Sequence, residues 1–139
     1  MNSEDMVKEF HKKYGHLVAS KPTTNIPHAV KTLRLRLIRE EFIEVREALL
    51  SDDLVEIADG IADLMYVLIG TAISYGIPIT RVFAEVHQSN MTKTNVKATN
   101  GSKYGTKTPK GPEYLPPDIS GILTEPKTMT VLERRNDSY

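Results

Sequence analysis

The stretch from Arg39 to Gly70 constrains the fold more than any other part of this chain of 139 residues. It reads REEFIEVREALLSDDLVEIADGIADLMYVLIG, which is two helical patterns separated by the polar break SDD. Acidic residues recur in it every three or four positions, so they share a helix face with aliphatic side chains instead of lying opposite them. A folded chain must therefore accommodate several carboxylates against its own apolar surface.

The acids form one group on each predicted helix. Glu41 and Glu44 occupy an otherwise apolar sector with Glu40 at its edge, and on the next helix Glu56 and Asp59 share a side, with Asp63 one turn further. Residues three or four apart on a helix have Cβ atoms about 5–6 Å apart, so each group contains a ready-made carboxylate pair. No lysine or arginine lies between Arg46 and Arg81 to neutralise these charges.

Like charges that converge between two helices need a neutralising partner. We expect the two helices to pack antiparallel across the short break, which turns the two acid pairs toward one another. At an effective dielectric constant near ~20, two unit charges about 4 Å apart repel by about 4 kcal/mol, a large share of a domain's margin of about 5–15 kcal/mol. Raised pKa values, basic partners or a hard divalent cation such as Mg²⁺ or Mn²⁺ would relieve the repulsion. The alternative is an ordinary solvated helix face.

The rest of the pattern predicts an all-α protein in three parts. Residues 1–92 should form a helical bundle, with helices from the N-cap Ser3 to Gly15, from Pro27 to about Leu50, from Leu54 to Tyr75, and from the cap Thr80 to about Met91. Residues 93–120 should belong to the same domain and form a basic lid or a short hairpin turning at Asn100-Gly101, followed by an extended arm. Residues 121–139 should form a flexible tail.

Composition narrows the classes of function. The formal net charge is zero, which removes the general attraction of a nucleic-acid or anionic-membrane binder. There is no cysteine, and the N-terminal segment carries acids and lacks the apolar core of a signal peptide. The uncharged run from Leu64 to Thr80 is too short and too interrupted to span a membrane. We therefore expect a cytoplasmic protein with no nucleic-acid and no membrane partner.

The histidines argue against one competing metal chemistry. A di-iron or di-manganese carboxylate site needs Glu-x-x-His pairs on two helices, and the chain has none. We interpret His11, His16 and His28 as surface or linker residues and retain only His87 as a site candidate.

Two short motifs resemble a known family. EEFIE at residues 40–44, followed by EIAD at residues 56–59, resembles the E-x-x-E, spacer, E-x-x-D signature of the all-α nucleotide pyrophosphatase superfamily, which includes MazG-type enzymes, dimeric dUTPases and phosphoribosyl-ATP pyrophosphohydrolases. EVHQSNMTK at residues 85–93 and KGPEYLPPDI at residues 110–119 are similar to a MazG-like branch with a basic segment after the fourth helix. The resemblance implies a four- to five-helix MazG-like bundle with a short C-terminal hairpin or extended arm.

The resemblance also implies roles for individual residues. Glu41, Glu44, Glu56 and Asp59 match the Mg²⁺ ligands, Glu40 and Glu41 match the catalytic acids, with Glu40 orienting or deprotonating water, and Asp63 is a second-shell acceptor or an extra ligand. Asn90 and Lys93 are candidates for binding the substrate phosphates, and His87 and Lys110 are weaker ones, as are Lys97, Lys103 and Lys107. We expect base recognition to come from the first helix and residues 21–27, and we expect Tyr66 to serve in packing.

The implied activity is Mg²⁺-dependent hydrolysis of a (d)NTP to the nucleoside monophosphate and pyrophosphate, in the removal of surplus or damaged nucleotides. Phosphoribosyl-ATP is the alternative substrate, and a non-catalytic helical module that binds nucleotide or a partner is the alternative class. Two long helices that are apolar on more than one side predict a homodimer or a dimer of dimers.

Overall fold

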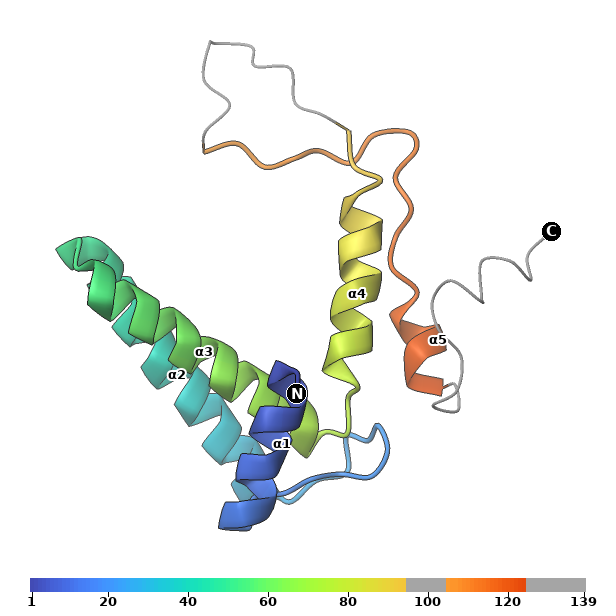
Figure 1. The fold of residues 1–139 in the computed structure, drawn as a ribbon. Helices are drawn as coiled ribbons and strands as arrows, with labels where there is room; N and C mark the ends of the chain where they lie inside the picture. The colour runs from blue at the N-terminus through green and yellow to red at the C-terminus, as the bar shows by residue number, and fades with distance from the viewer. Residues whose placement is uncertain (95–104, 125–139) are drawn as a thin grey trace. The chain divides into compact units, whose positions relative to one another are not determined.

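The computed structural model describes residues 1–94 and 105–124 and contains five α-helices and no strand within them. The helices are α1 (Ser3–Tyr14), α2 (His28–Ser51), α3 (Leu54–Ser74), α4 (Ile79–Asn90) and α5 (Ile119–Thr124) (Figure 1). The predicted all-α class is confirmed. The turn expected at Asn100-Gly101 lies outside the described residues.

The chain divides into two compact units, residues 1–79 and residues 80–139. The first unit contains α1, α2 and α3, and the second contains α4 and α5. The boundary between the units falls after Ile79, the first residue of α4. Each unit is described by itself below.

Local capping sets most of the helix ends. Asn2 caps α1 by accepting a hydrogen bond from the Asp5 amide at 2.9 Å, one residue before the predicted cap Ser3. Gly15 ends α1 in the left-handed conformation, as predicted. Asp53 caps α3 by accepting from the amides of Val55 and Glu56. At α4, by contrast, the predicted cap Thr80 already lies inside the helix.

The two long helices α2 and α3 pack side by side and antiparallel (Figure 1). Gly60 allows the close approach, because a Cβ there would lie 3.2 Å from Val45 Cγ2. At the other end of the pair, Gly70 faces Arg34 in the same way. Ten residues further along α3, from Gly60 to Gly70, the contact moves back from Val45 to Arg34 on α2, so the two helices run in opposite directions. The predicted hairpin is therefore confirmed.

The segment after α1 runs back along the end of α3. The amide of Ala19 donates to the Ile73 carbonyl at 3.2 Å, and the amide of Thr23 donates to the Tyr75 carbonyl at 3.0 Å. The Ser74 hydroxyl donates to the Leu17 carbonyl at 3.3 Å. These long-range bonds attach α1 and its linker to the C-terminal end of α3.

The hairpin of α2 and α3 has a small core and a broad exposed apolar surface. In the first unit Val7, Ala48, Ala72 and Ile73 are the buried hydrophobic residues. Exposed large apolar side chains on the two helices are Leu35, Phe42, Ile43, Leu49, Leu50, Leu54, Val55, Ile61, Met65 and Leu68. In the described residues α3 alone is long and apolar enough to cross a membrane, with a mean hydropathy of 1.5. Length and composition are weak grounds, since the core helix of a soluble protein passes the same test.

In the second unit, one polar face of α4 holds the C-terminal segment. The Ser89 hydroxyl donates to the Leu115 carbonyl at 2.7 Å, and the Leu115 amide donates to the Thr92 hydroxyl at 2.8 Å. The Asp118 amide donates to the buried carboxylate of Glu85 at 2.9 Å. The expected extended arm is thus attached to α4 through side chains spaced four and three residues apart.

The sequence pattern did not predict α5. It begins directly after Asp118, whose carboxylate accepts a hydrogen bond from the Gly121 amide at 2.9 Å, as an N-cap does. Its Ile122 is 1 % exposed and is the most buried large side chain of the second unit. An acidic cap and one apolar anchor therefore order a segment that the sequence pattern assigned to the arm and the tail.

Gly76 provides a test of the attachment between the linker and α3. Both Gly76 and Gly15 have positive φ, but a Cβ at Gly76 would overlap the Lys21 carbonyl oxygen, whereas at Gly15 no atom lies within 4 Å. We expect Gly76→Ala to lower the free energy of unfolding by about 1–3 kcal/mol more than Gly15→Ala does, because only Gly76→Ala adds overpacking to the conformational cost. Urea unfolding of the two variants measures the difference, and equal losses would contradict the close approach of Lys21.

Candidate metal and nucleotide site

Among the carboxylates of α2, Glu41 lies on the side of the helix that faces α3. Glu41 is half-buried, two turns before the buried Ala48 on the same face, while Glu40 and Glu44 are exposed. Glu40 also forms an exposed ion pair with Arg36 at 3.8 Å. Such surface pairs contribute little to stability, so Glu40 remains free to change partners.

The carboxylates of α3 lie next to those of α2 because the helices approach closely at Gly60. Asp59 precedes this glycine and Asp63 follows it by one turn. In the antiparallel register set by Val45 and Gly60, Asp63 lies at the level of Glu41. Glu56 lies one turn before Gly60, on the side of the connection between the helices.

The electrostatics identify which acids converge. Burial raises the pKa of Glu41, and the charges of Glu44, Asp63, Glu40 and Asp59 raise this pKa further, in that order. Glu41 Oε2 is buried and has no hydrogen-bond partner. A buried carboxylate oxygen that accepts nothing is costly, so this atom marks a place where the chain alone does not satisfy its own polar group.

The structure thus brings together five of the six predicted acids, namely Glu40, Glu41, Glu44, Asp59 and Asp63. Glu56 is exposed and is absent from the charges that act on Glu41. Among the described residues, no three His, Asp or Glu side chains lie close enough together to hold a metal ion as they stand. The carboxylates are therefore neighbours in one electrostatic cluster rather than a closed coordination shell.

The cluster has the chemistry of a site for a hard divalent cation. Its donors are all carboxylate oxygens, which suit Mg²⁺ and Mn²⁺. The unpaired Oε2 of Glu41 and the mutual repulsion around it would both be relieved by such an ion. The residues present fit the group that the sequence motifs imply.

Sequence analysis missed a polar cluster at the other end of the hairpin. His11 was interpreted as a surface residue, but it is only 2 % exposed, because α1 packs it against α2 and α3. Its Nδ1 lies 3.0 Å from the Leu17 carbonyl oxygen and its Nε2 lies 3.4 Å from Arg34 Nη1. Gly70 was the available signal, since a glycine inside an apolar helix often marks a close approach.

All the predicted phosphate-binding candidates belong to the second unit. His87 and Asn90 are exposed on α4, on the side away from the buried Glu85 and Ser89. Lys93 follows within one turn, and its amide donates to the Asn90 carbonyl at 3.1 Å. Lys110 Nζ lies 4.9 Å from the centre of the Tyr114 ring. Lys97 and Lys103 lie outside the described residues.

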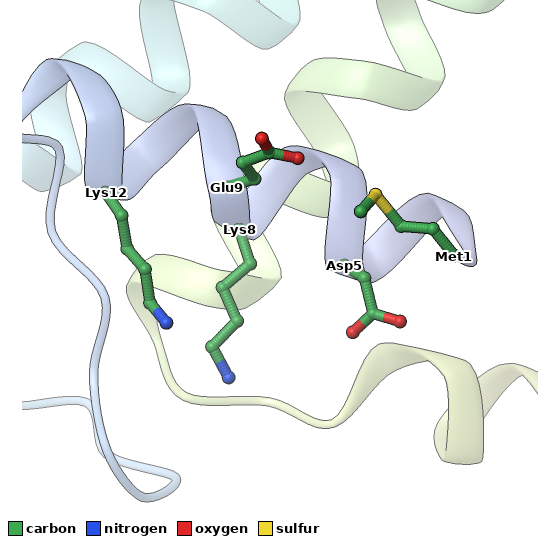
Figure 2. A pocket seen from close by; sticks show the side chains of 5 residues that line it. All are labelled: Met1, Asp5, Lys8, Glu9 and Lys12. Atoms are coloured by element: carbon green, nitrogen blue, oxygen red, sulfur yellow. The ribbon is translucent and has the colours of Figure 1, made fainter.

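A separate shallow hollow lies on the outer surface of α1. It is lined by Met1, Asp5, Lys8, Glu9 and Lys12, with the carboxylate of Asp5 and the amino groups of Lys8 and Lys12 extending from the same side of the helix (Figure 2). One helix supplies all five residues, and none of them belongs to the acid cluster. We assign no role to this hollow.

The helical fold and the carboxylates across the two long helices define a class, the all-α MazG-like nucleoside triphosphate pyrophosphatases. Within it, the family model described as "Phosphoribosyl-ATP pyrophosphohydrolase" matches residues 7–90, more than half of the chain. The chain therefore belongs to the phosphoribosyl-ATP pyrophosphohydrolase family, whose members are pyrophosphohydrolases acting on acid anhydrides. A search of curated proteins found no match.

The match confirms the resemblance to the superfamily and includes every acid of the cluster. This family consists of soluble metabolic enzymes that act on a nucleotide and typically use a divalent metal ion. The matched residues end at Asn90, so Lys93 and Lys110 lie beyond them.

The raised pKa of Glu41 has a consequence for the metal-free protein. Because the pKa is higher in the folded state than in the unfolded chain, ionised Glu41 destabilises the fold at neutral pH. We expect Glu41→Gln to raise the melting temperature in EDTA by about 2–6 °C at neutral pH. This gain should shrink as the pH falls through the raised pKa toward the ordinary carboxyl range near ~4.3.

Glu47→Gln is the matched control, since Glu47 is exposed on the same helix and pairs with Arg46. Added Mg²⁺ should raise the melting temperature of the wild type and of Glu47→Gln, but much less that of Glu41→Gln. A wild type whose melting temperature ignores Mg²⁺ would contradict the fit of the cluster to a cation.

Proposed function

We propose that this protein hydrolyses phosphoribosyl-ATP to phosphoribosyl-AMP and pyrophosphate in a reaction that requires Mg²⁺. The family match to residues 7–90 carries this proposal and favours phosphoribosyl-ATP over the general (d)NTP predicted from the sequence. The acid cluster of α2 and α3 supports it, because hydrolysis at a polyanion needs the negative charge to be neutralised.

In the proposed reaction, water attacks the α-phosphorus and the bond from that phosphorus to the oxygen bridging to the β-phosphate breaks. A bound divalent ion supplies neutralisation of the phosphate charge and orientation of the leaving group. Glu41, Glu44 and Asp59 would hold it, with Asp63 as a second-shell acceptor or a further ligand, since its charge also acts on Glu41. We keep Glu56 as a proposed ligand from the motif, although it lies outside the charges that act on Glu41.

Glu40 is our proposed residue for orienting or deprotonating the attacking water. It lies beside Glu41, and its ion pair with Arg36 is exposed and weak. Asn90 and Lys93 are our proposed contacts to the departing phosphates. They lie within one turn at the end of α4, and an amide and a lysine are common donors to phosphate oxygens.

The purified full chain should release pyrophosphate from phosphoribosyl-ATP with Mg²⁺ and not with EDTA. We expect Glu41→Gln to lower kcat/KM by about 100-fold or more, since it removes a ligand charge, and Glu47→Gln to leave kcat/KM nearly unchanged. A parallel panel of (d)NTPs distinguishes the alternatives. Turnover of a (d)NTP but not of phosphoribosyl-ATP would favour nucleotide house-cleaning, and no turnover by a folded protein would favour a non-catalytic module.

We also propose that a second copy of the chain covers the apolar surface of α2 and α3. Exposed apolar residues lie along both helices, from Leu35 to Leu68, and a monomer rarely leaves so large a contiguous surface in water. Stable interfaces bury more than about 1,000 Å², which two helices of 24 and 21 residues can provide. Such a homodimer would make the predicted nucleotide enzyme an assembly of two hairpins.

Sedimentation equilibrium should therefore give at least the mass of a dimer for the wild type. Phe42→Asp should shift the equilibrium toward monomer, because Phe42 is 58 % exposed on α2 and a charge in the interface core costs several kcal/mol. Phe83→Asp is the control, since Phe83 is 72 % exposed on α4. A monomeric wild type, or an equal response to both substitutions, would contradict this assembly.

A further inference from the structure

Arg34 is a buried cation with no anionic partner in the part of the chain that the structure describes. It is 6 % exposed, and its one hydrogen bond is from Nη1 to His11 Nε2 at 3.4 Å. Among the described residues, the ion pairs of α2 involve other arginines, Arg36 and Arg46. Burial lowers the pKa of Arg34, but a guanidinium stays protonated in proteins. The positive charge therefore remains, without a compensating anion among residues 1–94 and 105–124.

The histidine beside Arg34 does not supply the missing charge. Burial, the positive charge of Arg34 and the neighbouring His16 lower the pKa of His11, against the opposing effect of its bond to the Leu17 carbonyl. The neutral tautomer that donates from Nδ1 to Leu17 leaves the Nε2 lone pair to accept from Arg34. His11 therefore orients the guanidinium and leaves its charge unbalanced.

The free edge of Arg34 has the geometry of an oxyanion receptor. Nε is buried and has no hydrogen-bond partner. Nη2 makes no hydrogen bond to the described residues either, and it is not among the fully buried atoms that lack a partner. Nε and Nη2 form one side of the planar fork, and their two parallel N–H groups match two oxygens of a phosphate.

The surrounding helices hold this edge in place. A Cβ at Gly70 would lie 2.8 Å from His11 Nε2 and 3.2 Å from Arg34 Nη2. The glycine thus provides the space in which the imidazole and the guanidinium contact α3. Three helices converge on a rigid, pre-oriented cation, which is what a binding group requires.

The position of Arg34 relates it to the acid cluster. Arg34 precedes Glu41 by seven residues, so it lies on nearly the same face of α2, about 10 Å along the helix axis. Between these levels on α3 lies Tyr66, which is 39 % exposed and contacts the Phe10 ring edge to face at 5.5 Å. The half-exposed ring of Tyr66 therefore lies between the level of the acid cluster and the level of Arg34 on the hairpin.

We infer that Arg34 binds a phosphate group of the substrate that is separate from the phosphates held at the acid cluster. This inference rests on the proposed function and deepens it, because phosphoribosyl-ATP carries a phosphate on its added ribose in addition to its triphosphate. A plain nucleoside triphosphate has no second phosphate to offer. Arg34, oriented by His11, thus selects nucleotides that are phosphorylated at both ends.

Ribose 5-phosphate in EDTA probes this site without the metal and without turnover. The Nε–H signal of Arg34 in the full chain, followed by NMR, should shift on titration with ribose 5-phosphate and not with ribose. We expect Arg34→Met to raise the Kd for ribose 5-phosphate by about 10- to 100-fold, the effect of losing a charge-assisted bidentate contact. Arg39→Met, at an exposed position of the same helix, should leave the Kd unchanged.

Stability separates binding from a structural role. Replacing an uncompensated buried charge by a similar apolar side chain should leave the melting temperature unchanged or higher. In turnover, Arg34→Met should raise KM for phosphoribosyl-ATP and change kcat little. An Arg34 signal that ignores ribose 5-phosphate, or an equal loss of affinity in Arg39→Met, overturns the inference. If Arg34→Met fails to fold, Arg34→Lys and the wild-type NMR titration decide the question.

The two proposals fail in different ways. Specific binding of ribose 5-phosphate at Arg34 without any pyrophosphate release would contradict the proposed reaction while supporting the phosphate site. Release of pyrophosphate from phosphoribosyl-ATP with no response at Arg34 would support the reaction and overturn the phosphate site.

Discussion

The repulsion among carboxylates around Glu41 is the constraint on which the rest of the first unit depends. The close approach of α2 and α3 at Gly60 brings Asp63 to the level of Glu41 and Asp59 to about one turn from it. The same approach buries Glu41 Oε2 without a partner. The contact that holds the hairpin together therefore also creates its least favourable electrostatics. A fold that keeps this arrangement is better suited to holding a cation than to maximal stability of the chain alone.

The helices and the faces they present could be predicted because both follow from local spacing. Asp53, Gly15 and the acids of α2 act through residues within about one turn of themselves. The register between the helices is different, because it depends on where Gly60 lets Val45 approach. The helical period of about 3.6 residues determines which side chains share one face of a helix. It does not determine which turn of α2 packs against which turn of α3. The motif therefore identifies Glu56 and Asp59 as acids of one face of α3, but it does not say which acid of α3 lies at the level of Glu41.

The features that sequence analysis missed all depend on contacts distant along the chain. His11 becomes buried because it meets Arg34, 23 residues away, in space left by Gly70. α5 is ordered because Asp118 meets Glu85, 33 residues away, and because Ile122 is buried. The sequence does not show that His11 meets Arg34 or that Asp118 meets Glu85. The available signals were Gly70 inside an apolar helix and Asp118 after two prolines.

The spacing between Arg34 and Glu41 keeps two opposite charges from cancelling one another. At three or four residues apart on α2 they would form an ordinary helical ion pair. At seven residues they share a face but are separated by about 10 Å, which is beyond direct pairing. Each therefore stays unsatisfied at its own end of the hairpin, with Glu41 Oε2 and Arg34 Nε as the two buried side-chain atoms that lack partners in the described residues. These two unsatisfied atoms support our proposal of a ligand that brings a cation to Glu41 and a phosphate to Arg34.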